Sequence, residues 1–313
     1  MTTRHTSPQS RPFIVIAGPT ASGKSALAID IARKCDGVII NADSMQIYRD
    51  LHILTARPHR DEMGGVSHLL YGVVEGRYPC SVGQWLERAT EAAEQVWQAG
   101  QTPIMVGGTG MYLDAALNGI SAIPDIPQTV RAQVTSERQE IGADAFYDKL
   151  VQADPVLAAK LYPTDTQRVL RAMEVVRHTQ IPLSSWQKKP RTGQLNGQSA
   201  TIAYLPPRDA LYQNIERRFD EMVEKGAVDE VRLLLEQQLD VNLPVMKALG
   251  VGAFAEYLNG GCTLSEAIEL AKRDTRRYAK RQITWIRNNF ISNIEVNELY
   301  SKSICEKIFP KIF

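Results

Sequence analysis

Residues 13–25 of the chain read Phe13-Ile14-Val15-Ile16-Ala17-Gly18-Pro19-Thr20-Ala21-Ser22-Gly23-Lys24-Ser25. The first five are apolar and mostly β-branched, which predicts a strand buried on both faces of a sheet. The next eight fit the pattern G-x-x-x-x-G-K-[ST] of a phosphate-binding loop, and the apolar residues that follow predict a helix over 25–32. Strand, glycine-rich loop and helix in this order predict an α/β protein that binds a phosphate-bearing ligand.

Further strands and helices continue this pattern along the chain. Strands are predicted at 37–42 and 103–106, with an amphipathic helix over 82–99 between them. Another strand is predicted at 200–205, and mainly helical sequence follows from 209 to about 289. Because the strands alternate with helices, we predict a P-loop NTPase-like core with a parallel sheet and right-handed crossovers.

The middle of the chain predicts a helical insertion into this core. Pro124 and Pro127 interrupt the chain, and helical patterns follow at 129–140, 145–151 and 166–179 without a convincing strand between them. The polar stretch 188–197 predicts a mobile loop. We therefore expect a flexible N-terminus over 1–11, a core formed by 12–119 and 198–313, and an inserted helical domain over 120–197.

Composition limits the classes of function. Hydrophobic residues make up 44% of the 313 residues and charged residues 23%, as in ordinary folded proteins. The 36 Lys and Arg residues nearly balance the 35 Asp and Glu residues, so the net charge predicts neither a nucleic-acid nor a membrane partner. The four cysteines have no metal-binding spacing, and no early apolar run resembles a signal peptide. We expect a cytoplasmic protein without membrane association, and no feature requires more than a monomer.

The glycine-rich loop and the second strand supply candidate catalytic groups. Loop N–H groups and the following helix would hold a di- or triphosphate, with Lys24 as a point charge and the Ser25 hydroxyl on Mg²⁺. A glycine-rich turn without a ligand is the alternative. Asp43 follows the second strand, and the carboxyl ends of parallel strands meet at the ligand-binding edge of a sheet. Asp43 is then a magnesium ligand or a general base, or else a helix N-cap or turn residue.

The third strand runs into Gly107-Gly108-Thr109-Gly110. Nucleotide hydrolases of this class usually end such a strand in an acidic residue that holds Mg²⁺, so its absence counts against an ordinary ATPase. The glycines allow a ligand or another backbone to approach closely, and Thr109 can donate its hydroxyl, but a left-handed turn is equally compatible.

One segment is rich in cations, and another places two arginines on one helix face. Residues 272–287 contain seven Lys and Arg residues and one acid, Asp274, on a predicted helix with Tyr278 and Trp285. This density favours a surface for RNA phosphates, or partly a diphosphate site, over a solvated helix face. Arg168 and Arg171 share one face of another helix, where a surface salt-bridge stripe is the better interpretation on spacing alone.

Taken together, these motifs resemble the bacterial tRNA dimethylallyltransferase family, also called the tRNA isopentenyltransferase or IPP transferase family. The resemblance covers residues 13 to 290 and rests on 18–25, Asp43-Ser44-Met45-Gln46 with Tyr48-Arg49, His68-Leu69, Tyr78 with Ser81-Val82, Gly107-Gly108-Thr109-Gly110-Met111-Tyr112, Gln167-Arg168 with Arg171-Ala172, and Arg277-Tyr278-Ala279-Lys280-Arg281-Gln282 with Trp285. It implies a prenyltransferase that moves the dimethylallyl group of dimethylallyl diphosphate to N6 of the adenosine just 3′ of the tRNA anticodon, with Mg²⁺ and with release of diphosphate.

The resemblance also implies site residues. Asp43 would accept the proton of the amine, and Thr20 and Lys24 would act beside it. The implied diphosphate site is Gly18, Pro19, Thr20, Ala21, Ser22, Gly23, Lys24, Ser25 and Arg218. The implied contacts to the tRNA anticodon stem-loop, which the insertion would clamp, are Asp43, Ser44, Met45, Gln46, Thr109, Arg131, Gln167, Arg168, Val169, Leu170, Arg171, Lys247, Gly250, Arg277, Lys280 and Arg281.

The chain departs from the family pattern at a few positions. Asn214 stands where many relatives have Arg, and Val251 and Gly252 lack the aromatic and arginine often found after Gly250. Residues 51–58 keep only Thr55-Ala56 and Pro58 of D-I-G-T-A-K-P. These departures concern the grip on tRNA more than the reaction. Two other functions fit the glycine-rich loop: an ATP-dependent small-molecule phosphotransferase, and a non-catalytic P-loop RNA-binding protein.

Overall fold

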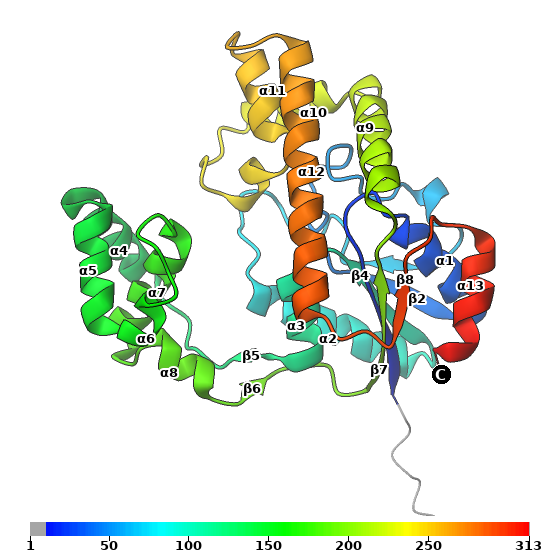
Figure 1. Ribbon diagram of the computed structural model, residues 1–313, viewed down its shortest axis with the longest axis horizontal. Helices are drawn as coiled ribbons and strands as arrows, with labels where there is room; N and C mark the ends of the chain where they lie inside the picture. Colours follow the sequence, from blue (N-terminus) through cyan, green and yellow to red (C-terminus); the bar gives the residue numbers. More distant parts are fainter. Residues whose placement is uncertain (1–10, 313) are drawn as a thin grey trace, which may run out of the picture. The chain divides into compact units, whose positions relative to one another are not determined.

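The computed structural model describes residues 11–312, which form two compact units. The first unit comprises the described residues up to Leu117 and from Gln194 onward. Its sheet has the order β3-β2-β4-β1-β7-β8, and all neighbouring strands are parallel (Figure 1). The strands are β1 Pro12–Ala17, β2 Gly37–Asn41, β3 His68–Leu69, β4 Thr102–Gly107, β7 Gln198–Tyr204 and β8 Ile294–Val296.

Helices cover both faces of the sheet. Residues of one parity, among them Ile14 and Ile16 of β1, pack against α1 and α13, while Phe13 on the other face contacts Trp97 of α2. Helix α3 follows β4, helices α9 to α12 follow β7, and α12 packs against α9 and α11. The helices of this unit are α1 Lys24–Lys34, α2 Val82–Gln98, α3 Gly110–Asn118, α9 Arg208–Glu224, α10 Ala227–Glu236, α11 Val251–Leu258, α12 Leu264–Asn289 and α13 Lys302–Ile308, with 3-10 turns at Arg60–Glu62, Pro244–Lys247 and Phe309–Lys311.

The second unit spans Asn118–Gly193 and has its own apolar core. Val134, Phe146 and Leu150 are fully buried in it. Glu137 of α4 binds Lys149 of α5 and Arg177 of α7, which fastens three of its helices together. Its elements are β5 Ile120–Ser121, α4 Gln128–Ile141, α5 Ala143–Ala153, α6 Pro155–Ala158, α7 Thr166–Thr179, α8 Leu183–Lys188 and β6 Arg191–Thr192.

The parallel α/β sheet predicted from the sequence is confirmed, and every predicted strand and helix is present within a few residues. The boundary of the insertion differs from the prediction of 120–197. Short strands β5 and β6 pair within the second unit, whereas Leu195 is buried and its N–H donates to the carbonyl of Ala116 in the first unit. Residues 1–10 of the expected flexible N-terminus lie outside the described residues. No helix from residue 11 to 312 is long and apolar enough to cross a membrane.

Candidate active site

The loop formed by residues 18–25, called the 18–25 loop below, is fixed by hydrogen bonds to its surroundings. The N–H of Gly18 donates to the carbonyl of Gly107 (3.2 Å), and the N–H of Ser22 donates to that of Pro19 (3.3 Å). The N–H of Thr20 donates to Oε1 of Gln282 (2.8 Å). These three amides, and Pro19 which has none, are therefore not free to bind a diphosphate.

The remaining donors of the loop form one group at the start of α1. The N–H groups of Ala21, Gly23 and Ser25 have no acceptor within the described residues, and the Ser25 side chain is exposed. Lys24 Nζ donates to the carbonyl of Pro19 (3.2 Å). Unpaired N–H groups at a helix N-terminus attract anions, and the free donors here lie beside a lysine.

Arg218 adds a second cation to this loop. Its Nη2 donates to Oγ1 of Thr20, which links α9 to the loop. The pKa of Lys24 is lowered to about 8, mainly because the side chain is buried; the nearby Asp43 opposes this shift, and Arg218 adds to it. Burial likewise lowers the pKa of Arg218 to about 10. Two partly desolvated cations that repel each other create a site that an anion would stabilise.

Asp43 lies two residues beyond β2, and part of its carboxylate is used locally. Its Oδ1 accepts the N–H of Met45 (2.9 Å) and more weakly that of Gln46 (3.4 Å). The buried side chain of Asn41 supports the same turn, because its Oδ1 accepts the N–H of Asp43 (2.8 Å). No hydrogen bond to Asp43 Oδ2 is present between residues 11 and 312. The prediction that Asp43 is a turn residue is thus confirmed, and its Oδ2 remains available to accept a proton.

The glycines after β4 allow close approach of other groups, as the sequence indicated. A Cβ on Gly107 would lie 2.0 Å from the carbonyl oxygen of Ala42, and one on Gly108 would lie 2.1 Å from Nε2 of Gln282. Neither glycine has a positive φ, so the alternative of a left-handed turn is wrong. Thr109 accepts the N–H of Ser44 (2.9 Å) and donates to its hydroxyl (3.2 Å). The β4 end therefore braces the turn that carries Asp43.

Gln282 of α12 connects these loops, although its sequence spacing gave no sign of this role. The side chain is only 4% exposed. Its Oε1 accepts from Thr20, and its Nε2 donates to the carbonyl of Gly108 (2.9 Å). One amide therefore sets the position of the 18–25 loop relative to the end of β4.

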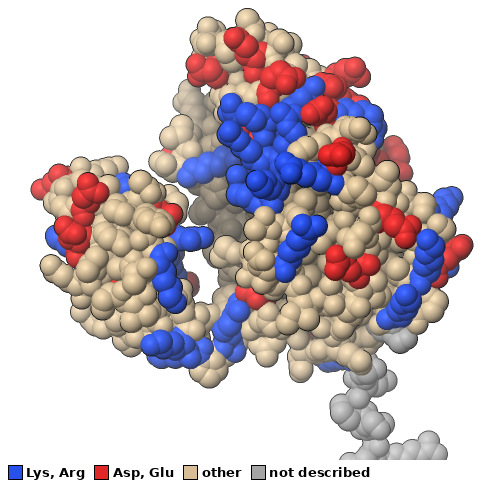
Figure 2. All heavy atoms as spheres, viewed as in Figure 1, with Lys and Arg blue, Asp and Glu red and all other residues tan. Residues whose placement is uncertain are grey.

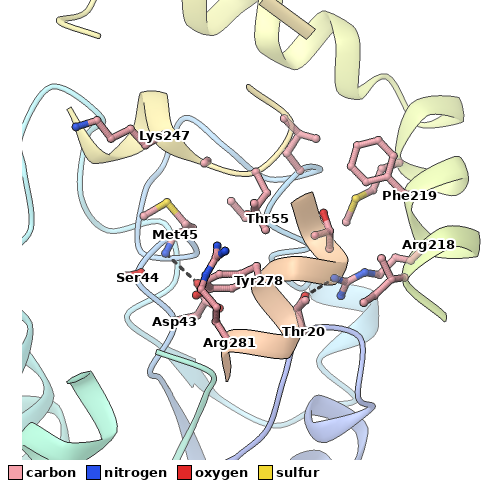
Figure 3. A pocket seen from close by; sticks show the side chains of 16 residues that line it. Thr20, Asp43, Ser44, Met45, Thr55, Arg218, Phe219, Lys247, Tyr278 and Arg281 are labelled. Carbon is pink, nitrogen blue, oxygen red and sulfur yellow. Dashed lines mark hydrogen bonds between the residues drawn. The ribbon is translucent and has the colours of Figure 1, made fainter. Parts of the chain in front are cut away.

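A pocket of about 240 Å³ is lined by Thr20 of the loop, Arg218 and Asp43, among others (Figure 3). Arg218 reaches Thr20 on one side, and Asp43 lies near Tyr278 and Arg281 on another. The pocket has a polar end and an apolar wall, and both come from the first unit. The residues that line it are Thr20, Asp43, Ser44, Met45, Leu54, Thr55, Ile215, Arg218, Phe219, Met222, Lys247, Ala248, Leu249, Thr275, Tyr278 and Arg281.

The loop that supplies Leu54 and Thr55 is held from two sides. Glu230 of α10 accepts the N–H groups of His52 (2.6 Å), Ile53 (2.8 Å) and Leu54 (2.9 Å) with one carboxylate. Gln46 Nε2 donates to the carbonyls of Thr55 and Ala56. The resemblance implies that Gln46 contacts tRNA, but in the structure its side-chain amide supports the loop that lines the pocket.

The cations of α12 divide into two groups. Lys272 and Arg276 pair with acids of α9, and Arg273 and Arg277 share Asp274. Lys280, Arg281 and Arg287 are exposed and have no acidic partner among the described residues. Figure 2 shows Lys and Arg side chains gathered over this helix. The alternative of a solvated helix face with paired charges therefore accounts for the cations up to Arg277, but not for those from Lys280 onward.

The residues of the second unit assigned to tRNA behave differently from one another. Arg131, Gln167 and Arg168 are exposed, and the two arginines have no ion pair in the described part of the chain. Arg171 pairs with Glu174 at 3.5 Å, as the salt-bridge interpretation predicted. The Val169 side chain is 1% exposed in the core of the unit and is not available to tRNA, whereas Leu170 is half-buried beside that core, so its assignment stays a prediction.

Two of the departures from the family pattern can be placed. Arg217 pairs with Glu221 (2.7 Å) and is exposed, so it does not supply the cation missing at Asn214. Gly250 begins α11 with a φ of 90°, and a Cβ there would lie 2.9 Å from Leu54. Gly250 therefore shapes the pocket wall, while Lys247 lines the pocket and is exposed.

Comparison with known proteins identifies the family. Residues 46–289 match the model of IPP transferases, and residues 12–73 match that of isopentenyl transferases. The chain belongs to the IPP transferase family. A tRNA dimethylallyltransferase of Rhodospirillum rubrum is 49% identical over 282 residues, which cover 90% of this chain and 86% of that protein. One of Paramagnetospirillum magneticum is 44% identical, with 97% and 96% covered.

Solved structures of IPP transferases share the fold. The structure of a tRNA isopentenylpyrophosphate transferase from Bacillus halodurans is similar with a TM-score of 0.68 and 33% identity, covering 96% of this chain and 95% of that one. A eukaryotic dimethylallyltransferase acting on tRNA has a TM-score of 0.83 and 28% identity, with 96% and 78% covered. The prediction of the family from the sequence motifs is confirmed.

Proposed function

We propose that the chain is a tRNA dimethylallyltransferase that transfers the dimethylallyl group of dimethylallyl diphosphate to N6 of the adenosine 3′-adjacent to the anticodon. One observation carries this proposal: a single pocket combines the anion-attracting end near Thr20 and Arg218, the carboxylate of Asp43 and an apolar wall. The family names of the relatives support the reaction class.

The diphosphate would bind at the 18–25 loop. The N–H groups of Ala21, Gly23 and Ser25 are free to bind its oxygens. The negative charge of the diphosphate would also offset the repulsion between Lys24 and Arg218. As the bond between C1 of the dimethylallyl group and its oxygen breaks, negative charge grows on the leaving diphosphate. Fixed donors at that place stabilise the transition state more than the ground state.

The nucleophile would be the exocyclic amine of adenosine, extruded from its stack as other base-modifying enzymes require. N6 forms the new bond to C1 while the C1–oxygen bond breaks, and the electron pair of that bond leaves with the diphosphate. Asp43 Oδ2 then accepts the proton that N6 loses, an effect worth about 10²–10⁴-fold. The apolar wall that includes Leu54, Ile215 and Phe219 would hold the five-carbon group.

The residues of the loop fit Mg²⁺ as a cofactor. Ser25 offers an exposed hydroxyl at the start of α1, while the described residues contain no group of three or more His, Cys, Asp or Glu side chains able to hold a metal. Mg²⁺ typically takes few protein ligands and completes its shell with phosphate oxygens and water. Ser25 would hold the ion, and bound Mg²⁺ would neutralise charge on the leaving diphosphate.

We further propose that the anticodon stem-loop of tRNA is the partner, bound by placed cations. Lys280 and Arg281 of α12 would contact its phosphates, and Arg131, Gln167 and Arg168 would do so from the second unit. The enzyme would act as a monomer in the cytoplasm, where tRNA is available.

Nucleoside mass spectrometry tests the reaction. Protein, Mg²⁺, dimethylallyl diphosphate and unmodified tRNA with adjacent adenosines in the anticodon loop should yield adenosine that carries one C5 prenyl group on N6. ATP consumption without RNA and without that product would instead support a phosphotransferase. RNA binding without either reaction would support the non-catalytic alternative. Lys24→Met should abolish the product and serves as the matched negative control.

A further inference from the structure

A second hollow lies along the C-terminal half of α12. Its lining is Arg277, Lys280, Arg281, Thr284, Trp285, Asn288 and Asn289, and we call it the α12 hollow. Arg281 lines both this hollow and the candidate active-site pocket. Arg281 aside, the residues of the hollow are not part of that pocket.

Trp285 is held flat against the backbone of Gly110. A Cβ built on Gly110 would lie 2.2 Å from Cδ2 and 2.4 Å from Cε2 of the indole, the two atoms shared by its rings. Such similar distances place Gly110 over the face of the ring system and not at its edge. The side chain is nevertheless partly exposed, and it lines the α12 hollow. The packing on Gly110 thus fixes the indole while it contributes surface to the hollow.

The groups around the indole are cationic and amide-bearing. Lys280 and Arg281 have no acidic partner in the described part of the chain, and the Arg281 guanidinium lies 5.6 Å from the ring centre of Tyr278. Asn289 donates to the carbonyl of Trp285, whereas the amide of Asn288 makes no hydrogen bond among residues 11–312. These groups match what a single-stranded nucleic acid needs from a binding site. The fixed aromatic ring offers a surface on which a base can stack, the free cations can contact phosphates, and the free amide can hydrogen-bond to the edge of a base.

We propose that the α12 hollow binds the base of a nucleotide directly adjacent to the modified adenosine, stacked on Trp285. This rests on the proposed function, because the adenosine must occupy the active-site pocket. Arg281 lies between the two sites, so the phosphate that joins the two nucleotides would contact its guanidinium. The hollow would then hold the anticodon loop in an unstacked form and favour purines, which stack more strongly, at the adjacent position.

A binding experiment without the prenyl donor tests this. Stem-loop RNA is compared with the same RNA that carries an abasic nucleotide on either side of the target adenosine, using wild-type protein, Trp285→Leu and Trp285→Phe. If the base stacks on Trp285, Trp285→Leu should weaken RNA binding about tenfold, and so should one of the two abasic changes. The variant protein combined with that abasic RNA should bind no more weakly than either change alone causes. Trp285→Phe, which can still stack, should lose less than Trp285→Leu.

Additive losses at both abasic positions, or an affinity unchanged by Trp285→Leu, would overturn the proposal. Unchanged affinity of the variants for inorganic diphosphate with Mg²⁺ shows that the 18–25 loop of each variant is still correctly folded. Because no product is measured, the result is independent of the reaction itself. A wild-type protein that forms no prenylated adenosine would refute the proposed function, while coupling between Trp285 and an abasic site would still stand as RNA binding.

Discussion

The affinity for dimethylallyl diphosphate should depend on pH through Lys24. Burial brings its pKa from 10.5 to about 8, so the ligand-free protein keeps this group charged at a cost of about 3 kcal/mol. A bound diphosphate favours the protonated form and raises the pKa again. Binding above pH 8 therefore takes up one proton, and the affinity should fall about tenfold per pH unit from about pH 8 to 10.

Calorimetric titration with Mg²⁺ and without RNA between pH 6.5 and 9.5 measures this dependence. The phosphates of the ligand are ionised by about pH 7, so their own titration does not contribute to the change in affinity between pH 7.5 and 9.5. Lys24→Met is the control: its affinity should be low and nearly independent of pH, because the pKa of Arg218, which burial lowers to about 10, lies above this window. An affinity that is equal at pH 7.5 and 9.5 in the wild type would refute the reasoning, as would an unchanged slope in Lys24→Met.

Three further variants address the supports of the site. Gln282→Ala leaves the Thr20 N–H and the Gly108 carbonyl unpaired, so diphosphate affinity and the free energy of unfolding should both drop, the latter by about 2 kcal/mol or more in denaturant titration. Glu230→Gln removes the carboxylate that holds the loop of Leu54, which should raise KM for the prenyl donor several-fold while RNA affinity stays constant. Arg168→Ala should lower the salt slope of RNA binding by about one, whereas Arg171→Ala, whose side chain pairs with Glu174, should leave the slope nearly unchanged.

The core of the fold could be predicted because the local signals agreed with one another. The β-branched run before Gly18 and the helix after Ser25 specify a strand–loop–helix unit, and β1 lies in the interior of the sheet as that pattern requires. Asp43 could be placed near the loop because parallel strands end at one edge. The sequence left its role open, and the structure shows that a turn residue can keep one oxygen free.

Other features depend on contacts between distant residues, which no local pattern encodes. Gln282 and Thr20 are 262 residues apart, and Glu230 is 178 residues from His52, whose N–H it accepts. The last strand, β8, is only three residues long, so periodicity could not identify it. Val169 was assigned to a surface by its neighbours in the motif, although its helical position places it in the core of the second unit.

The role of Asp43 as the base beside the diphosphate site is tested most directly by single-turnover prenylation with Asp43→Asn. With stem-loop RNA and dimethylallyl diphosphate both saturating, the variant should form prenylated adenosine about 10²-fold or more slowly than the wild type, with RNA affinity nearly unchanged. The contrary result is a wild-type rate of prenyl transfer in Asp43→Asn, which would remove Asp43 from the chemical step.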